Sequence, residues 1–491
     1  MKNILTPIIA ACAVGCMLPA CERQKYTDFR EEVKMVHVNE LPADLKAVRD
    51  YVAPDAVMAH RGSTFWTPEE TEAAYRWARE IGADYLELDL QCSKDGVILA
   101  LHDDNLKRTT DVENVYGEFI PSTRRAYYIA RGLTDEQADA QLQEDKAHFL
   151  PYYAASYMYD ELAKLDAGTW FNIKPEVGEP EQAQDKFSTI RQYISTLEDV
   201  IRIAEGKRLK RDANGERIYK IDSIDTAKPK IDRGDFDGST SYEAKYTFEY
   251  ENETPNEWRG NLPGIYPEFK ESWLNPSDME KRVYDKLDEL GWNIITNPAP
   301  ASEPFYTGAD NTVNVGKTNG KVVLQTFALS SLVRTSQVFG GKVPMNFLLW
   351  LNSGSLLEGT PSEYASTINL AIANKAHIIG PSIAGAPNNY GETNHAWQAY
   401  LIHKAGLLNH PYSFDTYEQM NKYYGVWDKN VKTEYNYVYG KDDNGKDLTR
   451  RYIDGMFTNH ADATLKFYRE QGKQKYNGTE SAQEVLKRLG Y

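Results

Sequence analysis

Cysteine is scarce in this chain of 491 residues, and three of its four cysteines, Cys12, Cys16 and Cys21, lie within the first 21 residues. If Cys21 is modified, Cys92 is alone, and we expect no disulfide in the body of the protein. Apolar residues make up 41% and charged residues 26% of the chain, which is ordinary for a globular protein. The composition therefore excludes disorder, collagen and coiled coil for the chain as a whole.

Positive charge is also in short supply. Lys and Arg total 56 against 72 Asp and Glu, which gives a formal net charge of −16. A nucleic acid or an anionic lipid surface as main partner is therefore excluded, because both require a basic footprint. Aromatic residues are plentiful at 12%, led by 33 Tyr, and suit a pocket that holds organic ligands.

Long apolar runs are missing except at the very start of the chain. There, Lys2 precedes a charge-free stretch from Ile4 to Ala20, which predicts a secretory signal peptide over residues 1–20. An uncleaved membrane anchor is the less favoured interpretation, because the run is at the short end for a bilayer span. We expect no membrane-spanning segment elsewhere in the chain.

The signal peptide ends in a motif that resembles a bacterial lipobox. The motif is Leu18-Pro19-Ala20-Cys21, and the polar chain begins directly after it, so Cys21 is the predicted lipidation site. Ala13-Val14-Gly15-Cys16 is a second candidate, and a plain cleaved signal peptide is a third interpretation. The leader thus predicts an exported bacterial lipoprotein on the periplasmic side of a membrane or at the cell surface.

Short apolar runs alternate with amphipathic stretches through the rest of the chain. Residues 21–52 predict a tether with a leading helix over Leu41–Tyr51, and residues 53–491 form the predicted main domain. Its predicted strands are Val57–His60, Tyr85–Leu90, Val97–Leu101, Gly264–Phe269, Val322–Phe327, Asn346–Leu351, Ala376–Gly380, Leu407–Phe414 and Tyr452–Thr458. Its predicted helices include Glu69–Ile81, Leu197–Ala204, Asp278–Leu290, Glu363–Asn374 and Ala461–Gln471.

This alternation predicts an α/β protein with a mostly parallel sheet covered by helices. The number of predicted strands slightly exceeds eight, so one or two of them should be wrong or lie outside a barrel. The step from Asp89 to Val97 is too short for a helical crossover, so these two strands are joined irregularly. Three segments are predicted to be insertions: a helical one near 113–157, a hairpin-rich one near 206–261, and a smaller one near 429–450.

Two predicted strands carry pairs of charged residues with a spacing of two. Glu87 and Asp89 share one face of Tyr85–Leu90, and Glu268 shares a face with Lys270. Adjacent carboxylates repel each other unless a cation lies between them. The strand Tyr85–Leu90, with Glu87 and Asp89 on one face, is therefore a candidate site for a hard metal ion. A solvent-facing polar edge is the alternative, and it fits poorly because the strand reads as internal.

Histidine is rare, and two of the nine histidines lie at strand ends. His60 and His102 each follow an apolar strand, and in barrels of this kind the strand ends converge on the active site. Two histidines there could serve as an acid and a base near neutral pH. Arg61, next to His60, could bind a phosphate with two hydrogen bonds.

With these residues in view, the chain resembles the glycerophosphodiester phosphodiesterase family. The most specific block is His60-Arg61-Gly62, Pro68-Glu69-Glu70-Thr71, Gly82 to Asp89, Lys94-Asp95-Gly96, Leu101-His102-Asp103 and Arg108-Thr109-Thr110-Asp111. Later pieces are weaker one by one, but they stand in the same order: Leu165 to Phe171, Ser195 to Glu198 and Gln325-Thr326-Phe327. Others resemble the periplasmic branch: Gly264 to Lys270, Ile379-Gly380-Pro381, His410 to Ser413 and Asp454 to Thr458.

The resemblance implies a TIM-type (β/α)8 barrel with loop insertions. It also implies one divalent metal, calcium rather than magnesium in the periplasmic branch, and it assigns the functional residues. The catalytic histidines would be His60 and His102, the metal ligands Glu87, Asp89 and Glu268, the phosphate-binding cations Arg61 and Lys270, and the pocket residues Glu69, Phe327 and Tyr412.

Three positions depart from the family's pattern. Glu70 stands where Asn or His is commoner, and Thr326 replaces Ser. Asn459-His460-Ala461 stands where Asp-Phe-Pro is usual, which we expect to affect the closing strand–helix turn more than the chemistry.

The implied function is metal-dependent hydrolysis of glycerophosphodiesters to glycerol 3-phosphate and an alcohol, with a small-molecule substrate and no nucleic acid. Three alternatives stay open. One is phospholipase-D-like cleavage of lysolipid or sphingolipid head groups, and another is a surface lipoprotein that binds a ligand without catalysis. The third is a glycoside hydrolase with two carboxylates and no metal, against which the paired histidines and Arg61 argue.

Overall fold

The computed structural model describes residues 29–173, 187, 190–234, 240–271, 273–351, 359–388, 390–425 and 452–491. The leader with Cys16 and Cys21 and the predicted insertion at 429–450 lie outside these residues. Within the described ranges, no helix combines the length and the apolar character needed to cross a bilayer.

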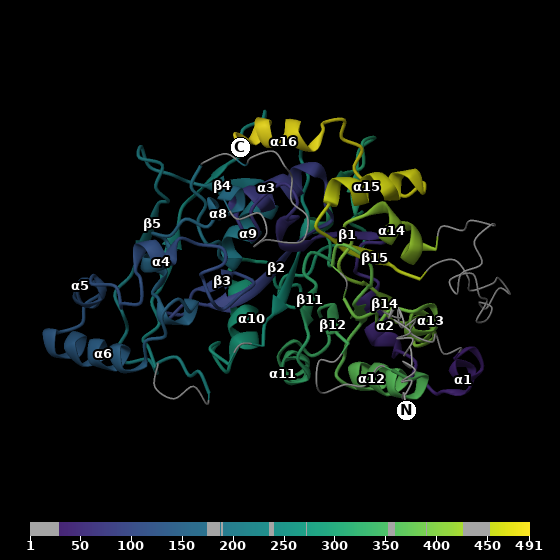
Figure 1. Ribbon diagram of the computed structural model, residues 1–491, viewed down its shortest axis with the longest axis horizontal. Helices are drawn as coiled ribbons and strands as arrows, with labels where there is room; N and C mark the ends of the chain where they lie inside the picture. The colour runs from purple at the N-terminus through teal and green to yellow at the C-terminus, as the bar shows by residue number, and fades with distance from the viewer. Residues whose placement is uncertain are drawn as a thin grey trace, which may run out of the picture.

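Eight parallel strands of the described chain are joined edge to edge in a barrel, with the order β14-β13-β12-β11-β8-β2-β1-β15 (Figure 1). The ring closes beyond β14, where the Phe414 amide donates to the Phe457 carbonyl at 2.7 Å. The strands are β1 (Ala56–Ala59), β2 (Tyr85–Cys92), β8 (Gly264–Phe269), β11 (Leu324–Thr326), β12 (Met345–Leu349), β13 (Ile378–Pro381), β14 (Leu408–Asn409) and β15 (Gly455–Thr458).

Each barrel strand is followed along the chain by a helix, so the predicted TIM-type (β/α)8 barrel is confirmed. In chain order these helices are α3 (Glu72–Ile81), α9 (Leu197–Ala204), α10 (Met279–Glu289), α11 (Leu329–Phe339), α12 (Pro361–Ala373), α13 (Ala396–Lys404), α14 (Tyr417–Tyr424) and α15 (Ala461–Glu470). Three further helices lie near the ends of the chain: α1 (Arg30–Met35), α2 (Ala43–Arg49) and α16 (Ala482–Leu489).

One of the nine predicted strands lies outside the barrel. Strand β3 (Ile98–Ala100) pairs antiparallel with the end of β2, with Leu90 opposite Ala100. The chain between β2 and β3 only has to reverse direction, and that is why a short connection suffices there. The crossover to the next barrel strand, β8, is completed much later, by α9.

The connection between β2 and α9 holds most of the helical insertion, and α5 and α6 extend well away from the barrel in Figure 1. Its helices are α4 (Val112–Val115), α5 (Arg124–Ala130), α6 (Asp135–His148), η2 (Ala154–Ser156), α7 (Tyr159–Leu162) and α8 (Trp170–Ile173). Between α9 and β8, two antiparallel pairs form, β4 with β7 and β5 with β6. These strands are β4 (Lys207–Leu209), β5 (Tyr219–Ile221), β6 (Tyr246–Phe248) and β7 (Tyr250–Asn252).

A third excursion, which the sequence did not predict, separates α10 from β11. It contains the antiparallel pair β9 (Tyr306–Thr307) and β10 (Thr312–Val313) and the short helix η4 (Val315–Lys317). The Tyr306 hydroxyl donates to the buried Asp84 carboxylate at 2.8 Å, so this segment packs against the start of β2. It therefore lies at the end of the barrel where the parallel strands begin.

Candidate active site

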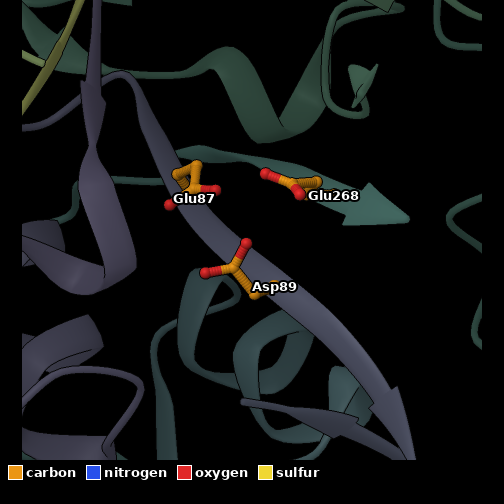
Figure 2. A group of neighbouring side chains, drawn as sticks. All are labelled: Glu87, Asp89 and Glu268. Carbon is orange, nitrogen blue, oxygen red and sulfur yellow. The ribbon is translucent and has the colours of Figure 1, made fainter. Parts of the chain in front are cut away.

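Three carboxylates meet at the end of the barrel where the strands finish. Glu87 and Asp89 come from β2, Glu268 comes from β8, and the register of the two strands places Asp89 opposite Glu268. One oxygen from each of the three side chains lies within 4.8 Å of the others, and all three residues are buried (Figure 2). The strand period of two thus brings together the residues that the sequence analysis selected as metal ligands.

The electrostatics of this cluster fit a cation. Burial, together with repulsion from Asp89, raises the pKa of Glu87 well above its usual range. Burial likewise raises the pKa of Glu268 to about 7, although Lys270 opposes the shift. Asp89 Oδ2 is buried and accepts no hydrogen bond from the described residues. A group of carboxylate oxygens with one unsatisfied buried atom suits a hard divalent ion.

Two cations border the carboxylates. Lys270 Nζ lies 3.0 Å from Glu268 Oε1 and 3.6 Å from Asp89 Oδ1. Arg61 Nε lies 3.3 Å from Asp89 Oδ2. Although burial acts against it, the charges of Lys270, His102 and Arg61 lower the pKa of Asp89. Both predicted phosphate-binding cations therefore lie beside the predicted metal ligands.

Arg61 is held in a strained turn directly after β1. The short helix η1 (His60–Gly62) has Arg61 at φ 50° and Gly62 at φ 84°, a region that residues with a side chain rarely adopt. A Cβ on Gly62 would lie 2.5 Å from Ala74 Cβ on α3, so only glycine fits there. The Arg61 amide donates to Glu87 Oε2 at 2.7 Å, which joins the turn to the carboxylate cluster.

His60 makes a contact that the sequence does not predict. Its Nδ1 lies 2.7 Å from Oδ1 of Asn459, which follows β15. From the sequence we expect Asn459-His460-Ala461 to affect the closing turn more than the chemistry. The turn leads from β15 into α15 directly, whereas Asn459 contacts a predicted catalytic residue. The contact joins residues 399 positions apart, so no local pattern could reveal it.

His102 is the start of a chain of charged groups that leads back to Arg61. His102 Nδ1 lies 2.6 Å from Asp103 Oδ1, and Arg108 Nε donates to Asp103 Oδ2 at 2.6 Å. Arg108 Nη1 also donates to Glu69 Oε2 at 2.8 Å, and Glu69 lies 3.5 Å from Arg61 Nη1. Burial, followed by the charges of Arg61 and Lys270, lowers the pKa of His102.

Glu69, which is predicted from the sequence only as a pocket residue, contacts both arginines. Burial opposes its ionisation, but Arg108 and Arg61 lower the pKa of Glu69 to about 2. Its carboxylate is thus charged near neutral pH and lies between the two arginines. Asp103 and Arg108 belong to the quoted motif, but their roles follow only from these contacts.

Glu70 and Gln325 complete the surroundings of the carboxylates. Glu70 Oε1 accepts from the Asp89 amide at 3.0 Å, and its other oxygen accepts from the Tyr75 hydroxyl. Gln325 Nε2 on β11 donates to Glu87 Oε1 at 2.7 Å. In the sequence, Glu70 stands out only as a departure from the family's pattern, and Gln325 stands out only as part of a motif. Both hydrogen-bond to β2, the strand that carries two of the predicted metal ligands.

Phe327 and Tyr412, the other predicted pocket residues, lie together. Their ring centroids are 5.5 Å apart and the rings are nearly perpendicular. Tyr412 follows His410, whose Nδ1 lies 3.2 Å from the Tyr266 hydroxyl inside the barrel. His410 therefore contacts a barrel-lining tyrosine, whereas His60 and His102 both lie close enough to Asp89 to influence its charge.

Comparison with known proteins agrees with this site. Residues 60–232 match the model of the glycerophosphoryl diester phosphodiesterase family. This segment is similar to that family. It contains the predicted catalytic histidines, Arg61 and two of the three carboxylates. The third carboxylate, Glu268, and Lys270 lie beyond the matched segment, and the pairing of β8 with β2 brings them to it.

Individual relatives match over similar lengths. A glycerophosphodiester phosphodiesterase of Bacillus subtilis is 28% identical over 162 residues, which cover 33% of this chain and 40% of that protein. One from Arabidopsis thaliana is 47% identical over 148 residues, 30% of this chain and 34% of that protein. The matches thus span less than half of these relatives' own length. A solved Oleispira antarctica phosphodiesterase has 13% identity and a TM-score of 0.41 over 84% of this chain and 96% of that one.

Proposed function

We propose that the protein is a metal-dependent glycerophosphodiester phosphodiesterase that releases glycerol 3-phosphate and an alcohol. The observation that carries the proposal is that all the predicted metal-binding, phosphate-binding and catalytic groups meet at one end of the barrel. We call this end, where the parallel strands finish, the barrel mouth. Two buried carboxylates, two cations and two histidines lie around the buried Asp89 there. The names of the relatives that match residues around His60 to His102 support the same reaction.

The residues divide the chemistry among themselves. Glu87, Asp89 and Glu268 would hold a divalent ion, which supplies positive charge next to the non-bridging phosphate oxygens. Arg61 and Lys270 bind those oxygens and stabilise the charge that develops on them. One histidine accepts the proton of the attacking hydroxyl, which belongs either to water or to the substrate's own glycerol. The other histidine donates a proton to the alkoxide that leaves as the P–O bond breaks. Where the glycerol hydroxyl attacks, water then opens the cyclic phosphate, and glycerol 3-phosphate is released.

We infer that the ion is calcium, with magnesium as the alternative outcome. The donor atoms are oxygens only, which both ions prefer over softer metals. Calcium tolerates irregular geometry and many ligands, whereas magnesium demands a near-ideal octahedron. Adding each ion back to chelated enzyme distinguishes them: recovery with calcium at a lower concentration than with magnesium supports the inference.

The histidine pair has its own test. Each single change, His60→Ala or His102→Ala, should reduce turnover by about 10²–10⁴-fold, since a positioned acid or base contributes this much. Because both act in one step, the double variant should lose much less than the product of the single losses. Turnover should follow a bell-shaped pH profile, with one limb lost in each single variant. Near-normal turnover of His102→Ala would refute the pairing.

The reaction itself is tested by release of glycerol 3-phosphate from glycerophosphocholine, with and without a chelator. Asp89→Asn should abolish release while the protein stays folded. Asp278→Asn is a matched control, because the side chain of Asp278, the N-cap residue of α10, is 51% exposed and pairs with Arg282. No release by the wild-type enzyme from any glycerophosphodiester would contradict the proposal and favour a ligand-binding protein. Release of choline from lysolipids alone would favour the phospholipase-D-like alternative.

We also propose that the protein is an exported lipoprotein anchored through Cys21. The support is the charge-free run that ends in Leu18-Pro19-Ala20-Cys21. Cys21→Ser should release the protein from the membrane fraction of the producing cell. If Cys16→Ser releases it instead, the second lipobox is the one in use, and release by neither variant would contradict lipid anchoring.

A further inference from the structure

Charged and aromatic side chains occupy different sides of the barrel mouth. The carboxylates, cations and catalytic histidines come from β1, β2 and β8 and from the loops that follow β1 and β3. On the other side of β8, the ends of β11, β12 and β14 and the segment after β13 carry aromatic residues. We call these residues the aromatic wall: Phe327, Trp350, Tyr390 and Tyr412.

The strand period explains why the aromatic wall faces the mouth. Gln325 on β11 reaches Glu87 inside the barrel, so Phe327, two residues later, follows on the same inward side. His410 reaches Tyr266 inside the barrel, and Tyr412 follows it in the same way. The ring centroids of Phe327 and Trp350 lie 6.5 Å apart, and those of Tyr390 and Tyr412 lie 5.8 Å apart.

The wall is rigid and partly open. The Tyr412 hydroxyl donates to the Leu349 carbonyl at 2.8 Å, which fixes this ring against the end of β12. Trp350, directly after β12, leaves 53% of its surface exposed, although tryptophan is usually well buried. Phe327 and Tyr412 are half-buried, so part of each ring is also available to a ligand.

We propose that the aromatic wall binds the alcohol half of the substrate and selects an alcohol that carries a quaternary ammonium group. This inference rests on the proposed function and adds the substrate class. The charged residues on one side of the barrel mouth bind the phosphate. The aromatic wall on the other side is then available to bind the leaving alcohol. Aromatic faces attract quaternary ammonium ions, and this is their best-known use as binding surfaces.

The aromatic wall should bind other alcohols less tightly. A primary ammonium or a polyol carries N–H or O–H donors that need acceptors once they leave water, and an aromatic face satisfies them poorly. A trimethylammonium group carries no such donors. All four wall residues are uncharged, and the net charge of −16 on the whole protein favours a cationic ligand over a second anion.

The test compares kcat/KM for glycerophosphocholine, glycerophosphoethanolamine and the neutral 3,3-dimethylbutyl analogue of the choline ester. The wild-type enzyme should prefer the choline ester over both others by about 2- to 30-fold, the range expected for a cation–π contact. Trp350→Leu should remove most of this preference and change kcat/KM for the ethanolamine ester less than twofold. Free choline should inhibit the wild-type enzyme more strongly than the variant.

Phe119→Leu is the control, because Phe119 is an aromatic residue, 77% exposed, on the insertion between α4 and α5. It should leave all three rates unchanged, and Phe327→Leu should reproduce the effect of Trp350→Leu. Thermal unfolding of each variant shows whether it is folded. Equal wild-type rates on the choline ester and its neutral analogue, or a uniform loss in Trp350→Leu, would overturn the inference. Absence of glycerol 3-phosphate from all three esters would instead overturn the proposed function.

Discussion

Asn459 is the residue whose contact changes the interpretation of the site most. Its amide oxygen lies 2.7 Å from His60 Nδ1, and both residues are held at the mouth of the barrel. The hydrogen bond of one ring nitrogen sets which tautomer a histidine adopts, and therefore what its other nitrogen can do. Asn459 thus acts through His60, as a positioning residue.

Removing the acceptor at Asn459 should slow the reaction without preventing substrate binding. In Asn459→Leu, His60 Nδ1 loses a buried partner, which costs about 1–3 kcal/mol and corresponds to a loss of roughly 5- to 150-fold in kcat. Asn459→Asp keeps an acceptor and should retain most of the turnover. Steady-state kinetics measures both, and an unchanged kcat in Asn459→Leu would contradict the positioning role.

Glu69 should contribute to stability in a pH-dependent way. Its pKa of about 2 in the folded protein lies below the usual 4.5, so the charged carboxylate stabilises the folded state. This contribution, about 3 kcal/mol by linkage, is fully present above pH 4.5 and is lost as the pH falls toward 2. In metal-free protein, Glu69→Gln should therefore lower the free energy of unfolding at pH 7 much more than at pH 3.

Denaturant unfolding at the two pH values measures the difference. Glu113→Gln is the control, because Glu113 pairs with Lys107 on the surface and both side chains are close to half exposed. It should change the free energy of unfolding by less than about 1 kcal/mol at either pH. An equal loss in Glu69→Gln at pH 7 and pH 3 would show that the carboxylate's charge is not the cause.

Among the elements, the turn η1 combines a strained backbone with predicted functional residues. Arg61 and Gly62 have positive φ angles, and His60 and Arg61 belong to the predicted active site. Gly62→Ala should destabilise the protein by about 2–5 kcal/mol, from backbone strain plus overlap with α3. It should also reduce turnover, since η1 positions His60 and Arg61. Gly340→Ala is a matched control: Gly340 has φ 66°, but a Cβ there meets nothing within 4 Å.

Thermal unfolding and kcat separate the two variants. Gly340→Ala should cost about 1 kcal/mol and leave kcat unchanged, because only its backbone conformation is unfavourable. Wild-type stability of Gly62→Ala would mean that the close packing of η1 against α3 is not maintained in solution.

The sequence predicted the barrel strands well because their side chains follow a simple rule. Strand β8 was predicted with its observed bounds, Gly264–Phe269, and the period of two placed Glu87 with Asp89 and Glu268 with Lys270. Strand β3 was predicted as a strand, but a run of apolar residues does not reveal which edge it joins. The length of the connection predicted only that β2 and β3 are joined irregularly, and not that β3 lies outside the barrel.

Contacts between distant segments were not predictable from one sequence. Gln325 and Glu87 are 238 residues apart, and Asn459 and His60 are 399 residues apart. Each of these contacts depends on which strands lie near each other in the closed barrel. Local periodicity in the sequence does not reveal that arrangement. Glu70 shows the same limit: its conformation at φ 59° and its bond to the Asp89 amide depend on η1 and β2 together.

In the molecule as a whole, a few positively charged residues lie at the barrel mouth of a protein with a large negative net charge. Arg61, Lys270 and Arg108 surround the carboxylates, while the chain as a whole carries a net charge of −16. Such a field attracts cations to the mouth and leaves phosphate recognition to a few fixed groups. A divalent ion would reduce the repulsion among Glu87, Asp89 and Glu268.

The measurement that tests this account most directly is the binding of a divalent ion to the metal-free protein. Calorimetric titration after exhaustive chelation should show one site per chain, a higher thermal stability with the ion bound, and recovery of activity in parallel. Asp89→Asn should lose the site but keep the fold, and Asp278→Asn should behave as wild type. Full activity after exhaustive chelation, or equal ion binding by Asp89→Asn, would contradict the account.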